Sequence, residues 1–122
     1  MGFAVTFDEP ARTARVKQSG DCDFVDAMNA FEGMRAAPGF RRTAKLLVDL
    51  SECHGERTPL EVEAMSGHLC ALFRGRFLAF VRSDDLVQHL AYAAEIIRRD
   101  GVIDARVFSS APDVEAWLRT VN

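Results

Sequence analysis

The sequence has few of the residues that mark fibrous, disordered or disulfide-stapled chains. Its 122 residues include only 4 Pro, 8 Gly and 3 Cys, too few for a collagen-like, linker-rich or disulfide-rich protein. Because the cysteines are odd in number and lack paired spacing, we expect reduced thiols and a cytoplasmic location. No apolar run approaches the ~20 residues of a membrane-spanning helix. The first ten residues also lack the basic and apolar regions of a signal peptide.

An excess of positive charge is absent as well. The chain carries 15 Lys and Arg against 18 Asp and Glu, for a formal net charge of −3, so nucleic acid is not an expected partner. Hydrophobic residues make up 48% and charged residues 27%, a composition typical of a soluble globular domain. The length predicts one domain over residues 1–122, large enough to bury its own core.

The N-terminal third predicts a hairpin followed by a helix. Apolar residues alternate over 3–7, a turn follows at 8–10, and residues 13–18 predict a second, polar strand at the edge of a sheet. Asp21 is the expected helix cap. The helix then carries one apolar stripe, formed by Phe24, Met28, Phe31 and Met34, and ends at Pro38-Gly39.

Three strands then alternate with helices. Residues 45–50, 76–81 and 105–108 are apolar runs typical of strands buried in a parallel sheet. Thr58-Pro59-Leu60-Glu61 predicts a helix start, because Thr58 can cap, Pro suits the first position and Glu61 can complete a capping box. We expect this helix to end at Gly75. The third helix is expected to start at Ser83 or Asp84, and the last near Ser110.

The order β-β-α-β-α-β-α-β-α predicts an α/β fold with a mostly parallel central sheet and an N-terminal β-hairpin. Functional sites of such sheets lie beyond the carboxyl ends of the strands. The sequence places loops there at residues 51–58, 82–85 and 109–112, each leading into a helix.

This order is similar to that of STAS domains, the fold of bacterial anti-sigma-factor antagonists. Three segments resemble its SpoIIAA-like, STAS/SEC14-type branch; they are Lys45-Leu46-Leu47-Val48-Asp49-Leu50-Ser51, Thr58-Pro59-Leu60-Glu61-Val62, and Arg106-Val107-Phe108-Ser109-Ser110 leading to Ala116-Trp117-Leu118. The resemblance covers nearly the whole chain and implies a regulatory domain that binds another protein.

The resemblance also implies where a phosphorylated switch residue would lie. In the antagonists, a serine within Asp-Ser-Ser-Gly follows the central strand. Here Asp49-Leu50-Ser51 resembles the start of that segment, and Thr58 falls near the acceptor position, but the serine pair and its glycine are absent. Thr58 is therefore the first candidate phosphoacceptor and Ser51 the second, although the residues themselves favour a plain helix cap at Thr58.

Other polar residues offer weaker candidates for chemistry. Ser83, Asp85 and His89 resemble fragments of a hydrolytic site, but no Gly-x-Ser-x-Gly elbow accompanies them, and a surface Asp85–His89 pair is the alternative interpretation. Neither Cys53-His54 nor His68 with Cys70 has the spacing of a metal site, and no glycine-rich loop predicts a cofactor.

These observations leave three functional hypotheses. The first is a non-enzymatic interaction module; its partner surface comprises Ser83, Asp84, Asp85, His89, Ser109 and Ser110. The second is a small-molecule or lipid-binding domain, with a pocket lined by Phe80, Leu86 and Phe108. The third is a cytoplasmic hydrolase. Arg41, Arg42 and Lys45 form either a solvated basic face or a contact for an anionic head group. If the second strand is an exposed edge, either homodimer formation or its own polar residues would protect it.

Overall fold

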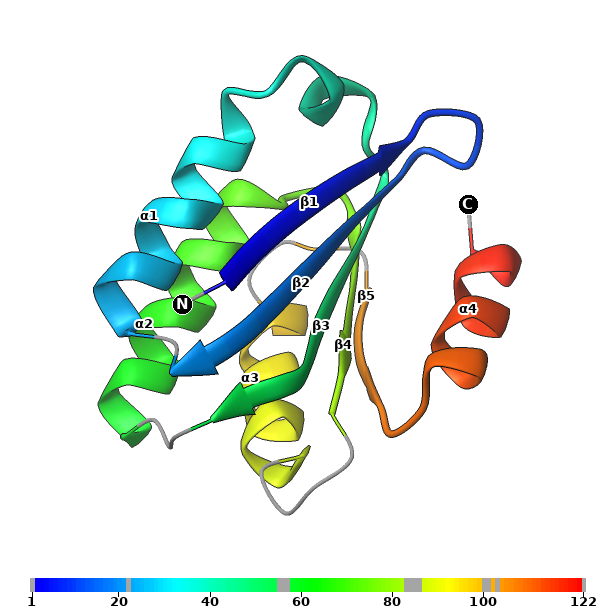
Figure 1. The fold of residues 1–122 in the computed structure, drawn as a ribbon. Coiled ribbons are helices and arrows are strands. Elements are labelled where there is room, and N and C mark those ends of the chain that lie inside the picture. Colours follow the sequence, from blue (N-terminus) through cyan, green and yellow to red (C-terminus); the bar gives the residue numbers. More distant parts are fainter. Residues whose placement is uncertain are drawn as a thin grey trace.

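Five strands form one mixed sheet, and they lie in the sheet in the order in which they occur along the chain (Figure 1). The computed structural model describes residues 2–21, 23–54, 58–82, 87–99, 102 and 104–121, without the side chains of residues 87–89. The strands are β1 (Gly2–Asp8), β2 (Thr13–Asp21), β3 (Lys45–His54), β4 (Phe77–Val81) and β5 (Asp104–Phe108). β1 runs antiparallel to β2, and β2 to β5 are parallel.

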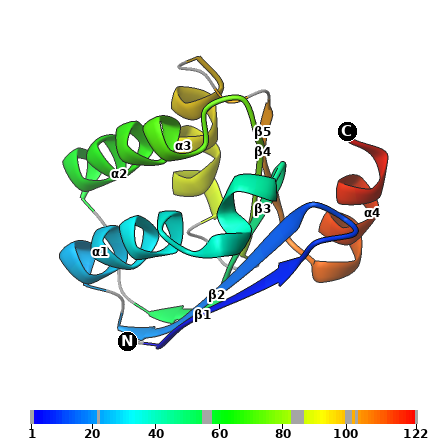
Figure 2. The ribbon, with the colours of Figure 1, turned by 90° about the horizontal axis from the view of Figure 1, so that it is seen from above.

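Helices follow the last four strands. They are α1 (Phe24–Arg35), α2 (Pro59–Leu72), α3 (Val87–Arg99) and α4 (Ala111–Thr120), with a short 3₁₀ helix, η1 (Pro38–Arg42), after α1. The predicted α/β class, the N-terminal hairpin and the mostly parallel sheet are therefore confirmed. Because crossovers between parallel strands are right-handed and each strand adds on the same side of the previous one, α1, α2 and α3 fall on one face of the sheet. Figure 2 shows α4 on the other face.

The two faces bury two separate apolar clusters. The larger cluster lies under α1, α2 and α3 and contains Phe31, Leu46, Phe73, Leu78 and Ile97, all 2% exposed or less. The smaller one lies under α4, where Val114 and Leu118 pack on Leu47, Ala79 and Val81. Alternate residues of β3 and β4 thus enter different clusters, which explains why both strands are apolar throughout.

The polar sequence of the second strand predicted a position at the edge of the sheet, and this prediction is wrong. β2 pairs with β1 on one side and with β3 on the other. Its residues Ala14, Val16 and Gln18 are buried on the side of α1. The polar residues between them, Arg15 and Lys17, face the side of α4, where they pair with Glu115 and Glu52. The described edges of the sheet are instead β1 and β5.

Three element boundaries differ from those predicted. Asp23, not Asp21, caps α1 by accepting from the N–H groups of Val25 and Asp26, because Asp21 still pairs with His54 in the sheet. β3 runs on to His54, where a loop was expected after residue 50. α2 ends at Leu72, and Gly75 lies in the turn beyond it with a φ of 75°, a conformation that favours glycine.

Candidate functional site

The carboxyl ends of the parallel strands and the starts of the helices lie at one end of the molecule, which we call the carboxyl edge (Figure 1). We define it by the last residues of β3 (Ser51–His54), Arg82 after β4, Ser109 and Ser110 after β5, and the first turns of α1 and α2. Of the expected loops, the one at residues 109–112 is confirmed only for Ser109 and Ser110, because α4 starts at Ala111. The one at residues 82–85 lies outside the described chain beyond Arg82.

A β-bulge shapes the end of β3. Lys17 pairs with Asp49 and Ser19 with Glu52, so β3 has one residue more than β2 between these pairs. Up to this point the even-numbered residues of β3 face α1, α2 and α3. Beyond the bulge Cys53, paired with Gly20, takes the inward position and is buried. Bulges redirect side chains in this way and often occur beside functional sites.

Arg82 holds this irregular strand end to its neighbours. The side chain is buried, with the residue only 8% exposed, and its guanidinium donates to the carbonyls of Leu50 (3.3 Å) and Cys53 (3.1 Å). Its backbone N–H donates to the carbonyl of Phe108 at 3.0 Å. Arg82 thus joins the ends of β3, β4 and β5. Its guanidinium also donates hydrogen bonds to two carbonyls of β3 in the region where the bulge interrupts the regular pairing with β2.

Sequence reasoning missed Arg82. The signal that could have found it is a single arginine directly after the apolar run of β4, Phe77–Val81. A charged side chain at such a position is buried only when polar partners satisfy it. One partner, the carbonyl of Cys53, lies in the segment predicted as a loop, and the bulge that turns it toward Arg82 has no signal in the sequence.

Thr58 occupies the predicted capping box. Its hydroxyl accepts from the N–H of Glu61 at 3.2 Å, and its own N–H donates to the Glu61 carboxylate at 3.0 Å. Thr58 is exposed at the start of α2. Leu60, two residues on, is 75% exposed, and Val25 in the first turn of α1 is 59% exposed. The starts of two adjacent helices therefore each present an apolar side chain beside a polar cap.

Ser51, the second switch candidate, lies before α2 on β3. Its hydroxyl and its N–H both donate to Asp49 Oδ1, at 2.5 and 3.0 Å. Ser110 is the N-cap of α4, with its hydroxyl accepting from the Asp113 N–H at 3.4 Å, and Ser109 is exposed beside it. Ser83, Asp84 and Asp85 and the side chain of His89 lie outside the described residues, so the hydrolase hypothesis stays a prediction.

The residues proposed for an apolar pocket do not come together. Phe80 belongs to the cluster under α1, α2 and α3, whereas Phe108 belongs to the cluster under α4, on the other face of the sheet. Leu86 lies outside the described residues. The prediction that Phe80 and Phe108 line one pocket is therefore wrong. Phe80 lies opposite Val107 in the sheet, and the next residue of the strand, Phe108, points to the other face.

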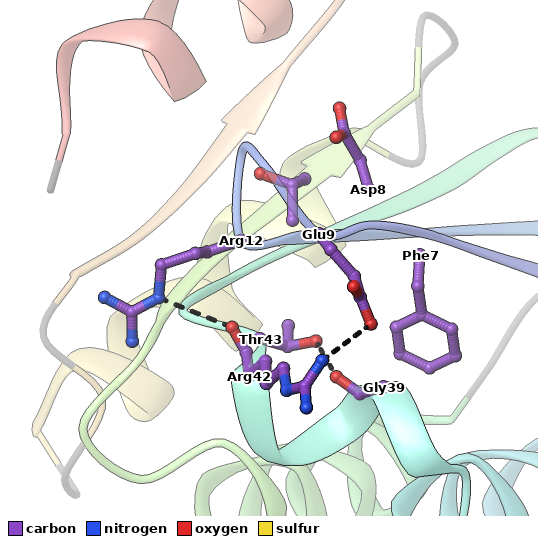
Figure 3. Close-up of a pocket in the computed structure, with 8 residues that line it drawn as sticks. Phe7, Asp8, Glu9, Arg12, Gly39, Arg42 and Thr43 are labelled. Atoms are coloured by element: carbon purple, nitrogen blue, oxygen red, sulfur yellow. Dashed lines mark hydrogen bonds and ion pairs between the residues drawn. The ribbon is translucent and has the colours of Figure 1, made fainter.

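A shallow recess lies at the opposite end of the sheet, between the β1–β2 turn and η1 (Figure 3). It has no enclosed space large enough for a water molecule, so it is a surface depression and not a small-molecule pocket. An ion pair between Arg42 and Glu9 (3.2 Å) crosses it. Its lining residues are Phe7, Asp8, Glu9, Arg12, Thr13, Gly39, Arg42 and Thr43.

The basic residues near β3 do not form one patch. Arg42 pairs with Glu9, while Lys45 donates to the carbonyl of Leu118 in α4 at 2.5 Å. Arg76 likewise bonds within the protein. It donates to the carbonyls of Thr43 and Leu72, and burial lowers its pKa. The alternative of an anionic head group held by Arg41, Arg42 and Lys45 together gains no support from this arrangement.

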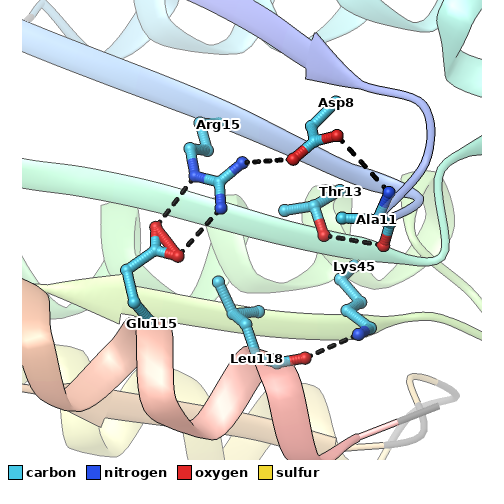
Figure 4. A network of polar contacts seen from close by, with 7 residues as sticks. All are labelled: Asp8, Ala11, Thr13, Arg15, Lys45, Glu115 and Leu118. Atoms are coloured by element: carbon cyan, nitrogen blue, oxygen red, sulfur yellow. Dashed lines mark hydrogen bonds and ion pairs between the residues drawn. The ribbon is translucent and has the colours of Figure 1, made fainter.

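An ion pair with two hydrogen bonds ties α4 to the sheet (Figure 4). Arg15 of β2 donates to both carboxylate oxygens of Glu115, at 2.9 and 2.8 Å, and lies 3.6 Å from Asp8. The hydrogen bonds to Arg15 lower the pKa of Glu115, and the same bonds raise the pKa of Arg15. This network is structural, since it connects the outer helix to the hairpin.

Within the described residues, no three His, Cys, Asp or Glu side chains are grouped closely enough to hold a metal ion. The same part of the chain contains no helix with the length and apolar character that a membrane crossing requires. The sequence matches no protein-family model and no curated protein. The resemblance to STAS domains therefore stays a prediction.

Proposed function

We propose that the protein is a non-enzymatic interaction module of the STAS type, working in the cytoplasm, and that it binds a protein partner with its carboxyl edge. The observation that supports this most is the exposed start of α2, where Leu60, 75% exposed, lies two residues after the N-cap Thr58. An exposed leucine alone is common on protein surfaces. Here Val25 repeats the arrangement at the start of α1, at the same end of the molecule.

The chemistry of the carboxyl edge suits a polypeptide partner. Apolar side chains supply contact area, and the hydroxyl groups and carboxylates around them supply hydrogen bonds, as in the centre and rim of protein interfaces. Arg82 holds the ends of β3, β4 and β5 together, and the capping box fixes the first turn of α2, so a partner would meet these parts already formed.

Thr58 is the better of the two switch candidates. A phosphate on Thr58 would lie at the positive end of α2, which stabilises negative charge. It would also repel the Glu61 carboxylate, which accepts from the Thr58 N–H, and so open the capping box and change the charge and shape of the docking surface. A phosphate on Ser51 would instead face the Asp49 carboxylate that now accepts its hydroxyl, and the like charges would repel.

A photo-crosslinking amino acid at position 60 tests the proposal. In extracts of the source cell, we expect it to form a crosslink to one discrete protein. A crosslinker at position 25 should capture the same protein, and Leu60→Asp should abolish that second crosslink. The matched control places the crosslinker at Ala71, which is exposed at the far end of the same helix. Crosslinks of equal yield from positions 60 and 71, or none from position 60, would refute the proposal.

The switch is tested on the same assay. We expect Thr58→Glu to change the yield of the position-60 crosslink at least several-fold relative to Thr58→Ser, which keeps the cap. If both variants behave as the unmodified chain does, Thr58 is a helix cap and nothing more.

A further inference from the structure

We infer that β1 is a self-pairing strand, and that two copies of the chain join their sheets by antiparallel β1–β1 pairing about a two-fold axis through Val5. β1 forms one edge of the sheet and pairs only along its β2 side. Figure 2 shows no element of the described chain beyond it. In an antiparallel ladder every second residue of such a strand directs its N–H and C=O outward, where they can accept another strand.

β1 lacks the features that usually protect an edge. Between Gly2 and Asp8 it reads Phe-Ala-Val-Thr-Phe, with no charge and no proline. Its register with β2 continues without a bulge over all seven pairs. Lysine, proline, bulges and inward charges are the common devices that prevent edge pairing, and none of them occurs within this strand.

The other edge, β5, is protected. Over only five residues it carries Asp104 and Arg106, which form an ion pair at 2.9 Å. The Arg106 guanidinium also lies 5.7 Å from the centre of the Trp117 ring in α4. A second strand at this edge would have to displace or bury these charges, so the contrast between the two edges selects β1.

The sequence of β1 is complementary to itself in one register. With Val5 opposite Val5 of the second copy, Phe3 lies opposite Phe7, Ala4 opposite Thr6, and Gly2 opposite Asp8. All seven residues of the strand are then paired. A shift by two residues in either direction shortens the pairing and leaves Phe3 or Phe7 without a partner, and a shift by one would set apolar against polar positions.

This register also joins like surfaces. Phe3, Val5 and Phe7 are half-buried and pack against the larger core cluster, with Phe3 edge-on to Phe31 at 5.4 Å between ring centres. Residues directly opposite in an antiparallel pair project from the same face of the sheet. The two apolar rows would therefore become continuous, while Ala4 and Thr6 would meet on the other face. The acidic Asp8 residues fall at opposite ends of the joint.

A two-fold axis makes such a contact closed, because each β1 strand satisfies the other and no free edge of this kind remains. The two five-stranded sheets would become one continuous sheet. Since the contact is small compared with standard protein interfaces, we expect a weak dimer whose population depends on concentration.

Two substitutions separate dimer formation from folding. Within one chain Ala4 lies opposite Lys17 and Thr6 opposite Arg15. These cations already pair with Glu52 and Glu115, but both substituted positions are exposed, so we expect the monomer with two added glutamates to stay folded. In the dimer, however, the carboxylate at position 4 of each copy would lie opposite the carboxylate at position 6 of the other, and the two-fold axis makes two such repulsive pairs. We expect A4E/T6E to be monomeric in sedimentation equilibrium at concentrations where the unmodified chain dimerises.

The register is tested by restoring the charge complement. In A4E/T6K each carboxylate at position 4 would face an ammonium group at position 6 of the second copy, and we expect the dimer to return. A64E/A71E adds two carboxylates at exposed positions of α2 and should dimerise normally, while circular dichroism checks that all variants are folded. A monomeric unmodified chain at all concentrations, a dimeric A4E/T6E, or an A4E/T6K that stays monomeric while folded would overturn the inference.

Discussion

The Arg15–Glu115 pair permits a quantitative test of how α4 is held. Arg15 donates two hydrogen bonds to the Glu115 carboxylate, the most favourable geometry for an ion pair. The side chains are 35% and 34% exposed, so solvent screens part of their attraction. We therefore expect a coupling free energy of about 1 kcal/mol, at the upper end of the values for exposed pairs.

This coupling energy is measurable by thermal unfolding. At ~2.1 cal/mol/K per residue, a chain of this length unfolds with an entropy of roughly 0.26 kcal/mol/K, so 1 kcal/mol corresponds to about 4 °C in Tm. Glu115→Gln, Arg15→Gln and the double variant complete a double-mutant cycle, which isolates the pair from the separate effects of each change. The Lys17–Glu52 pair on the same face, with side chains 53% and 58% exposed, is the control, and its coupling should stay below about 0.5 kcal/mol.

The pair also has a predictable dependence on pH. Because the pKa of Glu115 is lower in the folded state than in the unfolded state, its contribution to stability is fully present above the ordinary carboxyl pKa. It is lost as the pH falls below that value and through the lowered folded pKa. The Tm difference between the unmodified chain and Glu115→Gln should therefore shrink in acid. A coupling below about 0.3 kcal/mol at pH 7, or a difference that persists unchanged at about pH 3, would refute the reasoning.

Three further changes test other parts of the structure. Thr58→Ala removes the cap of α2 and should lower the free energy of unfolding by about 1 kcal/mol, with Thr58→Ser as the control. Arg82→Met leaves the carbonyls of Leu50 and Cys53 without this donor and should cost about 2–4 kcal/mol in urea unfolding. Gly39→Ala brings a Cβ within 2.7 Å of the Phe7 ring and should cost about 1–3 kcal/mol; an unchanged midpoint in either of these last two variants would contradict the packing described.

The sequence predicts most of the fold because local signals agree with one another. Thr58, Pro59 and Glu61 specify the start of α2 by hydrogen bonds within four residues, so no distant contact is needed to find it. The position of β2 could not be predicted in the same way. Its polar residues suggest an exposed edge, but Arg15 is satisfied by Glu115, which lies 100 residues away.

The candidate site was predicted only in outline. The caps Thr58 and Ser110 were identified because their signals are local. The role of Arg82 depends on the bulge in β3, which arises from pairing with β2 and leaves no clear mark in either strand. Likewise, choosing Asp23 over Asp21 as the cap of α1 requires knowing that Asp21 is still paired with His54.

The sequential strand order has a consequence for the growing chain during synthesis. Each strand pairs with the one made just before it. The sheet can therefore be extended one strand at a time as the chain leaves the ribosome, because each new strand finds its partner nearby in the sequence. The exception is α4, whose Glu115 must find Arg15 across nearly the full length of the chain. We expect docking of this helix to be the last folding step, so that a nascent chain lacking its final residues would hold a formed sheet with the cluster around Leu47 and Ala79 still open to water.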